Sequence, residues 1–163
     1  MGVRLPAELA ALLNELGYLW PEVDEESLHR LSTAWIGFGA RLGVATGQAD
    51  AVTEAVRRGN AGEAIDAFLT AWRREDAPRT VVAEGVTGAR VVGVCLVVCA
   101  ALVLALKIAF FVQLVALLVR IRLAVAMAAA TSGASLLTIP AAKRLTGLLL
   151  NLAVNQASRV LVA

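Results

Sequence analysis

The second half of this 163-residue chain lacks acidic residues: all 13 Asp and Glu residues lie between Glu8 and Glu84. Residues 1–84 carry eight arginines against these 13 acids, a net charge of −5. Residues 85–163 have a net charge of +7, from Arg90, Lys107, Arg120, Arg122, Lys143, Arg144 and Arg159. This asymmetry predicts either two layers that attract each other or a tail attracted to anionic lipid. Seven dispersed cations form no phosphate-binding stripe, so we expect no nucleic acid partner.

Aromatic residues, histidine and cysteine are also scarce. Aromatics make up 5% of a chain that is 59% hydrophobic, so aliphatic side chains and alanine supply the apolar surface, which suits close-packed helices better than sheets. The single histidine, His29, lies beside Arg30 and is expected on the surface. Cys95 and Cys99 lie one helical turn apart in an apolar run, and we expect small buried hydrophobic residues there, not a disulfide or metal ligands.

No pattern in the sequence indicates catalysis. A phosphate-binding Gly-Lys-Ser/Thr loop and a Gly-x-Ser-x-Gly elbow are both missing. The acids at 22–26 are explained by the positive end of a following helix, with Asp24 as its N-cap. We therefore predict a protein that is not an enzyme, with no catalytic residues, no metal, no cofactor and no small-molecule substrate. The N-terminal residues do not resemble a Sec signal peptide, so any export is expected to use another route.

Helical periodicity dominates and predicts an all-α fold. We expect two long helices at about 25–58 and 79–128, with shorter helices starting near Pro6, at the capping-box-like pair Asn60 and Glu63, and at Pro140 after a break at 131–135. The first long helix carries a heptad seam, the pattern of left-handed helix packing. The seam, called the apolar seam below, consists of Leu28, Leu31, Trp35, Phe38, Leu42, Ala45, Ala49, Val52 and Val56.

Small residues form a stripe on each predicted long helix. Gly39, Gly43 and Gly47 recur every fourth residue, although each interior glycine costs roughly 1 kcal/mol against alanine. The second long helix has a similar stripe of Gly85, Ala89 and Gly93. Because a stripe without side chains lets another backbone approach closely, both stripes are predicted to be packing or oligomerisation faces.

The segment from Val91 to Val119 is the most apolar part of the chain. Lys107 and Gln113 are its only strongly polar members, and as a helix it reaches about 43 Å, beyond a bilayer core of about 30 Å. Lys107 would cost roughly 2.5–3.5 kcal/mol near a bilayer centre, whereas each large apolar residue returns about 0.3–0.6 kcal/mol. Insertion is therefore energetically feasible if Lys107 reaches the interface or lines a pore. The alternative is burial against other helices, with Lys107 paired to an acid from residues 1–84.

The order of these features resembles the WXG100-like N-terminal domain of actinobacterial outer membrane channel proteins and polymorphic toxins. The resemblance covers nearly all of residues 1–163, read as one domain with an acidic amphipathic half (1–84) and a basic apolar half (85–163). It rests on "WPEVDEESLHRLSTAW", "GEAIDAFLTAW" and "ATSGASLLTIPAAKRL". The family motif residues are Trp20, Pro21, Trp35, Phe68 and Trp72. The resemblance implies an all-helical domain associated with type VII secretion.

Two departures from the family pattern concern the secretion motifs. Trp35-Ile36-Gly37 lies in the middle of the apolar seam, so we expect a helix there instead of the turn that Trp-x-Gly makes in true WXG100 proteins. The only Tyr-x-x-x-Glu match, Tyr18 to Glu22, contains Pro21 and precedes the long helices, so it is not expected to present a helical secretion signal. No toxin domain is expected within the 163 residues.

Two functions fit these observations. The first is a secretion-associated helical protein that oligomerises and inserts in or crosses a membrane, as a channel, pore or toxin-translocation module. The alternative is a soluble partner or adaptor module whose apolar helices are buried in a homo- or hetero-oligomer. Both predict a helical partner or further copies, and a secreted or envelope-associated location reached by a non-Sec route.

Overall fold

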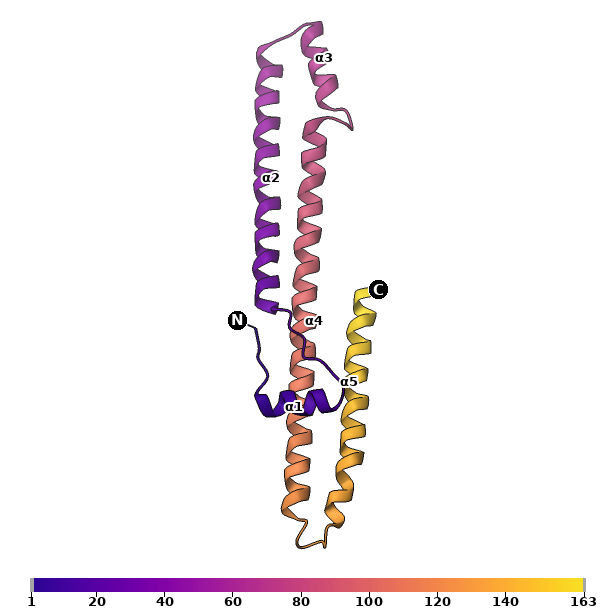
Figure 1. The fold of residues 1–163 in the computed structure, drawn as a ribbon. Helices are drawn as coiled ribbons and strands as arrows, with labels where there is room; N and C mark the ends of the chain where they lie inside the picture. The colour runs from indigo at the N-terminus through magenta and orange to yellow at the C-terminus, as the bar shows by residue number, and fades with distance from the viewer. Residues whose placement is uncertain (1, 163) are drawn as a thin grey trace. The chain divides into compact units, whose positions relative to one another are not determined.

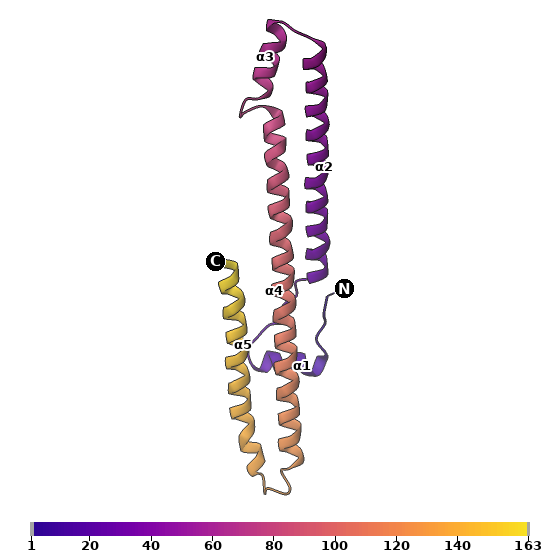
Figure 2. The same ribbon diagram turned by 180° about the vertical axis from the view of Figure 1, so that it is seen from behind.

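The structure, a computed structural model, describes residues 2–162, with side chains to Val160. It is 82% helical. Within the described residues the elements are α1 (Ala7–Glu15), α2 (Glu25–Gly59), α3 (Glu63–Trp72), α4 (Pro78–Ala126), a 3-10 helix η1 (Ala134–Leu137) and α5 (Thr138–Val162) (Figures 1 and 2). No strand occurs in this range. The predicted all-α fold is confirmed, and both long helices end within about two residues of the predicted bounds.

The described chain divides into two compact units. The first unit, Ser27–Cys99, contains most of α2, all of α3 and the first part of α4. Within it α2 and α4 run side by side and antiparallel in both views (Figures 1 and 2). The second unit combines the chain up to Glu26 with the chain from Ala100 onward.

In the first unit, the buried positions of α2 are occupied by small residues. Ser32, Gly39 and Thr53 are its buried residues, spaced in multiples of seven. Four large side chains of the apolar seam are exposed, namely Leu31 at 48%, Trp35 at 37%, Phe38 at 43% and Val52 at 65%. Leu28, Leu42 and Val56 are half-buried. The internal contact of α2 is therefore close at its small residues, and it leaves much of the seam exposed.

In the second unit, α1 packs across α4 and α5 (Figure 1). The core cluster is apolar and consists of Leu9, Leu13, Phe110, Leu114 and Leu150, all at most 4% exposed. Tyr18 follows α1 and seals the cluster. Its ring meets that of Phe110 edge-on, with centroids 6.2 Å apart, and its hydroxyl donates to the Gly147 carbonyl at 2.9 Å.

Helix ends follow local chemistry, with two corrections to the sequence predictions. Asp24 caps α2 as expected, since its Oδ1 accepts from the Glu26 N–H at 3.1 Å. The predicted capping box is wrong: the N-cap of α3 is Gly62, whose φ of 117° a side chain rarely adopts, and Asn60 instead donates to the Val56 carbonyl and closes α2. The last helix begins at Thr138, two residues before Pro140, because η1 leads directly into it.

The glycine stripe of α2 supplies a matched pair of test positions. A Cβ at Gly39 would lie 3.3 Å from both the Ala89 Cβ and the Val86 carbonyl oxygen, whereas a Cβ at Gly47 would meet nothing within 4 Å. We expect Gly39→Leu to lower the free energy of unfolding by roughly 1–3 kcal/mol through overpacking. Gly47→Leu should raise it by up to about 1 kcal/mol through helix propensity. Denaturant unfolding followed by circular dichroism measures the free energy of unfolding of both variants. Equal changes in the two variants would contradict a closer contact at Gly39 than at Gly47.

Candidate interaction surfaces and a buried lysine

Lys107, the single charge inside the apolar run, is buried in the second unit and is fully paired. It is 2% exposed, and its Nζ donates to Glu25 Oε2 at 2.5 Å and to the Val23 carbonyl at 2.8 Å. The second oxygen of Glu25 accepts from the Val3 N–H at 2.9 Å. The segment before α2 therefore covers the middle of α4 at Lys107, the one charge between Arg90 and Arg120.

The pair changes the chemistry of Glu25. Hydrogen bonding by Lys107, helped by the Val3 N–H, lowers the pKa of Glu25 to about 2. Glu25 is only 13% exposed and Lys107 3% by side chain, so removing either partner would leave the other charge buried without its counterion.

Two further ion pairs join the acidic N-terminal segment to the basic helices of the same unit. Arg122 donates to Glu8 at 2.9 Å, and Lys143 pairs with Glu15. Together with Lys107–Glu25 they confirm, within this unit, the predicted attraction between acidic and basic halves. Arg122 and Glu8 are well exposed, so this pair contributes little stability and mainly sets position.

The small-residue stripes meet only in part. Gly39 lies against Ala89, and a Cβ on Gly93 would come within 2.6 Å of Ile36 Cγ1 and 3.3 Å of the Ser32 carbonyl oxygen. The remaining stripe glycines have more room: a Cβ at Gly43 would lie 4.0 Å from Val86 Cγ1, one at Gly85 would lie 3.6 Å from Leu42 Cδ1, and one at Gly47 would meet nothing within 4 Å.

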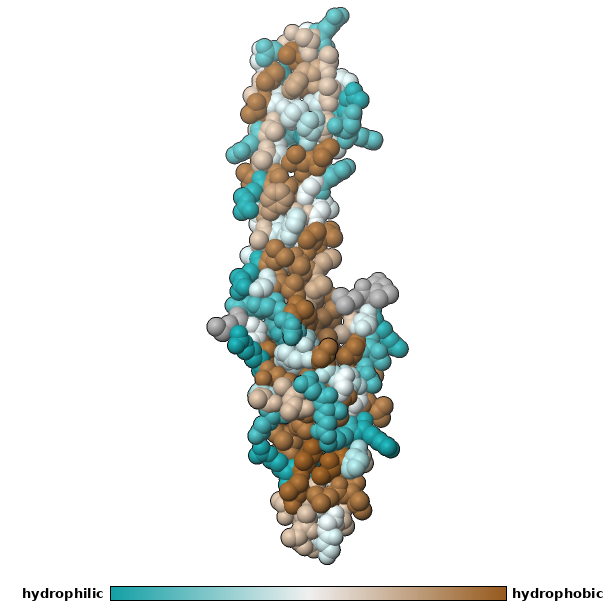
Figure 3. All heavy atoms as spheres, in the orientation of Figure 1, coloured by the Kyte–Doolittle hydropathy of each residue, from teal (hydrophilic) through white to brown (hydrophobic). Residues whose placement is uncertain are grey.

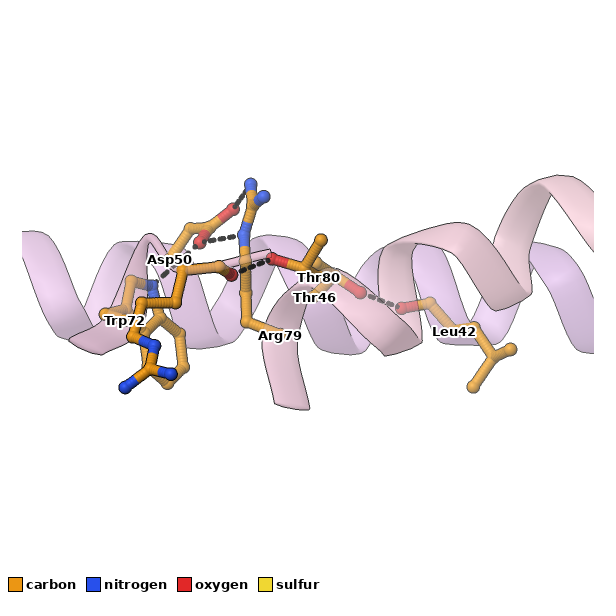
Figure 4. A network of polar contacts seen from close by, with 7 residues as sticks. Leu42, Thr46, Asp50, Trp72, Arg79 and Thr80 are labelled. Atoms are coloured by element: carbon orange, nitrogen blue, oxygen red, sulfur yellow. Dashed lines mark hydrogen bonds and ion pairs between the residues drawn. The ribbon is translucent and has the colours of Figure 1, made fainter. Parts of the chain in front are cut away.

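The family-motif aromatics of the first unit lie in two separate places. Phe68 and Trp72 stack at 6.0 Å on α3, and the Trp72 Nε1–H points to Asp50 Oδ1 at 3.4 Å. The Arg79 guanidinium donates two hydrogen bonds of 2.8 and 2.9 Å to the Asp50 carboxylate (Figure 4). These hydrogen bonds lower the pKa of Asp50. Asp50 thus ties α3 and the start of α4 to α2, whereas Trp35 lies on the exposed seam.

Trp20 and Pro21, the other motif residues, belong to the second unit. Trp20 packs against the core cluster around Leu9 and Phe110. With Pro21 it lines a pocket of about 340 Å³ that also reaches Lys107. They hold the segment that delivers the Val23 carbonyl and Glu25 to the lysine.

Apolar side chains cover much of the remaining surface. Trp35 and Phe38 meet edge-on at 6.0 Å and, with Leu31 and Ala34, form a shallow hollow of about 160 Å³ on the apolar seam. Two described helices, Pro78–Ala126 and the segment Ala134–Val160, are long and apolar enough to cross a membrane by length and composition. The most apolar window of the first has a mean hydropathy of 2.8, yet only 17% of it is buried. Brown apolar spheres accordingly reach the surface along much of the face in Figure 3.

The side chains that could take part in chemistry lie apart from one another. His29 is exposed as expected. The expected burial of both cysteines is wrong, because on α4 Cys95 is exposed and Cys99 is half-buried. Among residues 2–162, no three His, Cys, Asp or Glu side chains gather as a metal site would require.

Sequence comparison decides the family. A family model described as "WXG100 like domain" matches residues 4–147. The chain belongs to the WXG100-like domain family. The family is one of helical proteins related to type VII secretion, not known as enzymatic, whose members are secreted without a Sec signal and commonly associate with helical partners. No curated protein and no solved structure matches the chain.

The WXG100-like assignment holds although its two short motifs are displaced. Trp35-Ile36-Gly37 lies inside the unbroken helix α2, so it forms no turn here. Tyr18 to Glu22 lies between α1 and α2 and has no helical face. The sequence indicated that Lys107 could pair with an acid from residues 1–84, but it did not indicate that this acid is Glu25. Sequence reasoning also passed over the internal stripe of Ser32, Gly39, Thr46 and Thr53, whose spacing of seven is visible in the sequence.

The pKa of Glu25 predicts an acid-dependent loss of stability. An unfolded glutamate has a pKa near 4.3, and the folded value is about 2. A lowered folded pKa stabilises the fold above the unfolded value, and that contribution is lost as pH falls from about 4.5 toward 2. Glu25→Gln should be less stable at neutral pH and lose less on acidification, whereas Glu22→Gln, a nearby exposed carboxylate, should follow the parent. Thermal unfolding between pH 2 and 7 measures this, and parallel curves for the parent and Glu25→Gln would contradict it.

Proposed function

We propose that this WXG100-like protein is a helical association module of type VII secretion, whose apolar helix faces are covered by a further copy of the chain. The main support is the exposure of α4, the most apolar helix. Only 17% of its most apolar 18-residue window is buried within one chain. Monomeric soluble proteins rarely expose large contiguous apolar patches, so such a surface marks an interaction site.

The apolar seam of α2 fits another helix best. Its spacing of 3 and 4 residues over about four heptads is the period at which helices pack by knobs into holes. The seam narrows from Leu31, Trp35 and Phe38 to the alanines at 45 and 49. In an antiparallel pair of identical chains, the bulky half of one seam faces the small half of the other. This complementarity supports a second copy as the occupant.

The pairing of Lys107 also supports an assembly in water. With Glu25 and the Val23 carbonyl around its Nζ, the lysine needs no contact with water or lipid headgroups. The charge that most opposes burial of α4 is neutralised within the chain, which leaves the exposed apolar surface free to associate.

If the apolar seam joins two copies of the chain, replacing seam residues should lower the mass of the oligomer. Replacing equally exposed apolar residues off the seam should leave that mass unchanged. Leu31→Gln with Phe38→Gln removes two seam residues that are 48% and 43% exposed. Val44→Gln with Val81→Gln removes two residues off the seam that are at least as exposed, at 62% and 58%. Light scattering without detergent should show an oligomer for the parent and control and a smaller species for the seam variant. A monomeric parent, or equal masses for both variants, would contradict the proposal.

A second candidate function, membrane insertion with channel or pore activity, is supported by the hydropathy of α4. Its most apolar window averages 2.8, and α5 also passes the length and composition test. In this function Lys107 leaves Glu25 and lines a water-filled interior, where one lysine per subunit would favour anions.

Lys107 separates the two functions. In the soluble assembly, Lys107→Leu would leave the Glu25 carboxylate without its counterion. The midpoint of thermal unfolding should therefore fall by several degrees. In a pore, parent protein in planar bilayers should conduct anions preferentially, Lys107→Glu should reverse this preference, and Lys107→Leu should abolish it. No conductance from the parent, with a clear loss of stability in Lys107→Leu, excludes the pore and retains the association module.

A further inference from the structure

The end of the hairpin between α4 and α5 carries no charge. Between Arg122 and Lys143 lie 20 consecutive residues without Asp, Glu, Lys or Arg. They include the last turn of α4, the connecting turn, η1 and the first turn of α5. This segment, Leu123–Ala142, is called the hairpin tip below.

The large apolar side chains of the tip point outward. Leu137 is 80% exposed, and the others with high exposure are Leu123 at 59%, Val125 at 57%, Met127 at 47% and Leu136 at 41%. On the face shown in Figure 3 the corresponding end of the hairpin is brown, beige and white. A water-facing turn is usually polar, so the tip reverses the common arrangement.

Three of the four hydroxyl groups of the tip donate to backbone carbonyls of the chain, while Ser132 is exposed. The hydroxyl of Thr131 donates to the Met127 carbonyl, that of Ser135 to the Ala124 carbonyl at 2.6 Å, and that of Thr138 to the Ser135 carbonyl. The turn also makes backbone bonds, among them Gly133 N–H to the Ala128 carbonyl at 2.7 Å. Internal satisfaction of polar groups is what a lipid environment demands and what water does not require.

A collar of cations borders the tip on both helices. It consists of Arg120 and Arg122 on α4 and Lys143 and Arg144 on α5. Arg122 and Lys143 pair with Glu8 and Glu15. Arg120 and Arg144 are exposed, and the structure gives neither an ion pair nor a hydrogen bond with any residue from 2 to 162. Within the described chain, two free guanidinium groups therefore flank an uncharged apolar end.

The spacing of collar and tip matches the depth of an interfacial anchor. Four residues of α4 separate Arg122 from the end of the helix, and five steps of α5 separate Thr138 from Lys143. At 1.5 Å per residue the helical parts of the tip are about 6 and 7.5 Å long, and residues 127–137 extend the tip beyond them. Interfacial apolar faces enter a membrane by roughly 5–10 Å, so cations at this height lie among the lipid phosphates.

We propose that the hairpin tip is a membrane anchor that inserts into the surface of an anionic bilayer down to the level of the basic collar. It requires neither a spanning α4 nor a covered apolar seam, so it goes beyond both proposed functions. Charge selects lipid over a protein partner here: the collar is cationic on both helices, and anionic headgroups match a ring of cations around an apolar end. An uncharged protein pocket would leave Arg120 and Arg144 without counterions.

The test is flotation of the full chain with vesicles of phosphatidylcholine alone or mixed with phosphatidylglycerol. The parent should float mainly with the anionic vesicles and dissociate at high salt. Arg120→Gln with Arg144→Gln should weaken binding by about tenfold or more, since each cation near an anionic surface contributes roughly fivefold. The charge-matched control, Arg73→Gln with Arg159→Gln, removes two exposed arginines outside the collar and should bind as the parent does.

The apolar part is tested in the same assay. Leu136→Gln with Leu137→Gln should abolish flotation, whereas Leu19→Gln with Leu148→Gln, exposed at 85% and 67% in the parent, should not. In a Leu137→Trp variant, brominated lipids should quench the added fluorescence, which places residue 137 below the headgroups. Thermal unfolding of each variant confirms that the fold is retained.

The possible failures are distinguishable. Flotation that survives both tip and collar variants would overturn the tip anchor while supporting insertion through α4. A parent that forms oligomers but floats with neither kind of vesicle would overturn the anchor and leave the association module intact. Equal flotation with neutral and anionic vesicles would overturn the role of the collar.

Discussion

The structure depends on one constraint: α4 is far more apolar than a single chain of this length can cover. Its 49 residues contain one internal lysine between Arg90 and Arg120, and apolar area removed from water stabilises by roughly 25 cal/mol per Å². The chain covers α4 where it can, with α1 and α5 around Leu114 and with the small face of α2 around Ala89. The rest of its apolar surface is exposed in the described chain, and this is the surface that the proposed assembly would cover.

The placement of charge solves a second problem created by the same helix. A lysine in an apolar run is costly unless it is paired and hydrogen-bonded. The sequence places Glu25 at the first position of α2 and Val23 just before it, so one turn of chain supplies both a counterion and a carbonyl to Lys107. The acids Glu8 and Glu15 act similarly on Arg122 and Lys143, but near the surface. The N-terminal segment thus supplies counterions to three cations of its own unit, whose part from Ala100 onward carries no acid.

The fold was largely predictable because its signals are local. Heptad spacing, Asp24 as a cap and the break at 131–135 each act within a few residues, and the helix bounds agree closely with the structure. The failures are also physical. Asn60 and Glu63 match a capping box in sequence, yet Gly62 with its positive φ takes the cap position. Which acid would pair with Lys107 could not be read from sequence, since partners 82 positions apart are brought together only by tertiary packing.

The inversion on α2 is the most informative departure from sequence reasoning. A helix normally turns its large apolar side chains toward its own core, but α2 presents Ser32, Gly39 and Thr53 to α4 and leaves Leu31, Trp35 and Phe38 outside. Because these residues are small, α2 can approach α4 closely without burying its large apolar side chains. Those side chains remain available for a contact between chains. The proposed assembly would cover these exposed residues of α2, and it would also cover Cys95 and the apolar residues of α4 that the described chain leaves exposed.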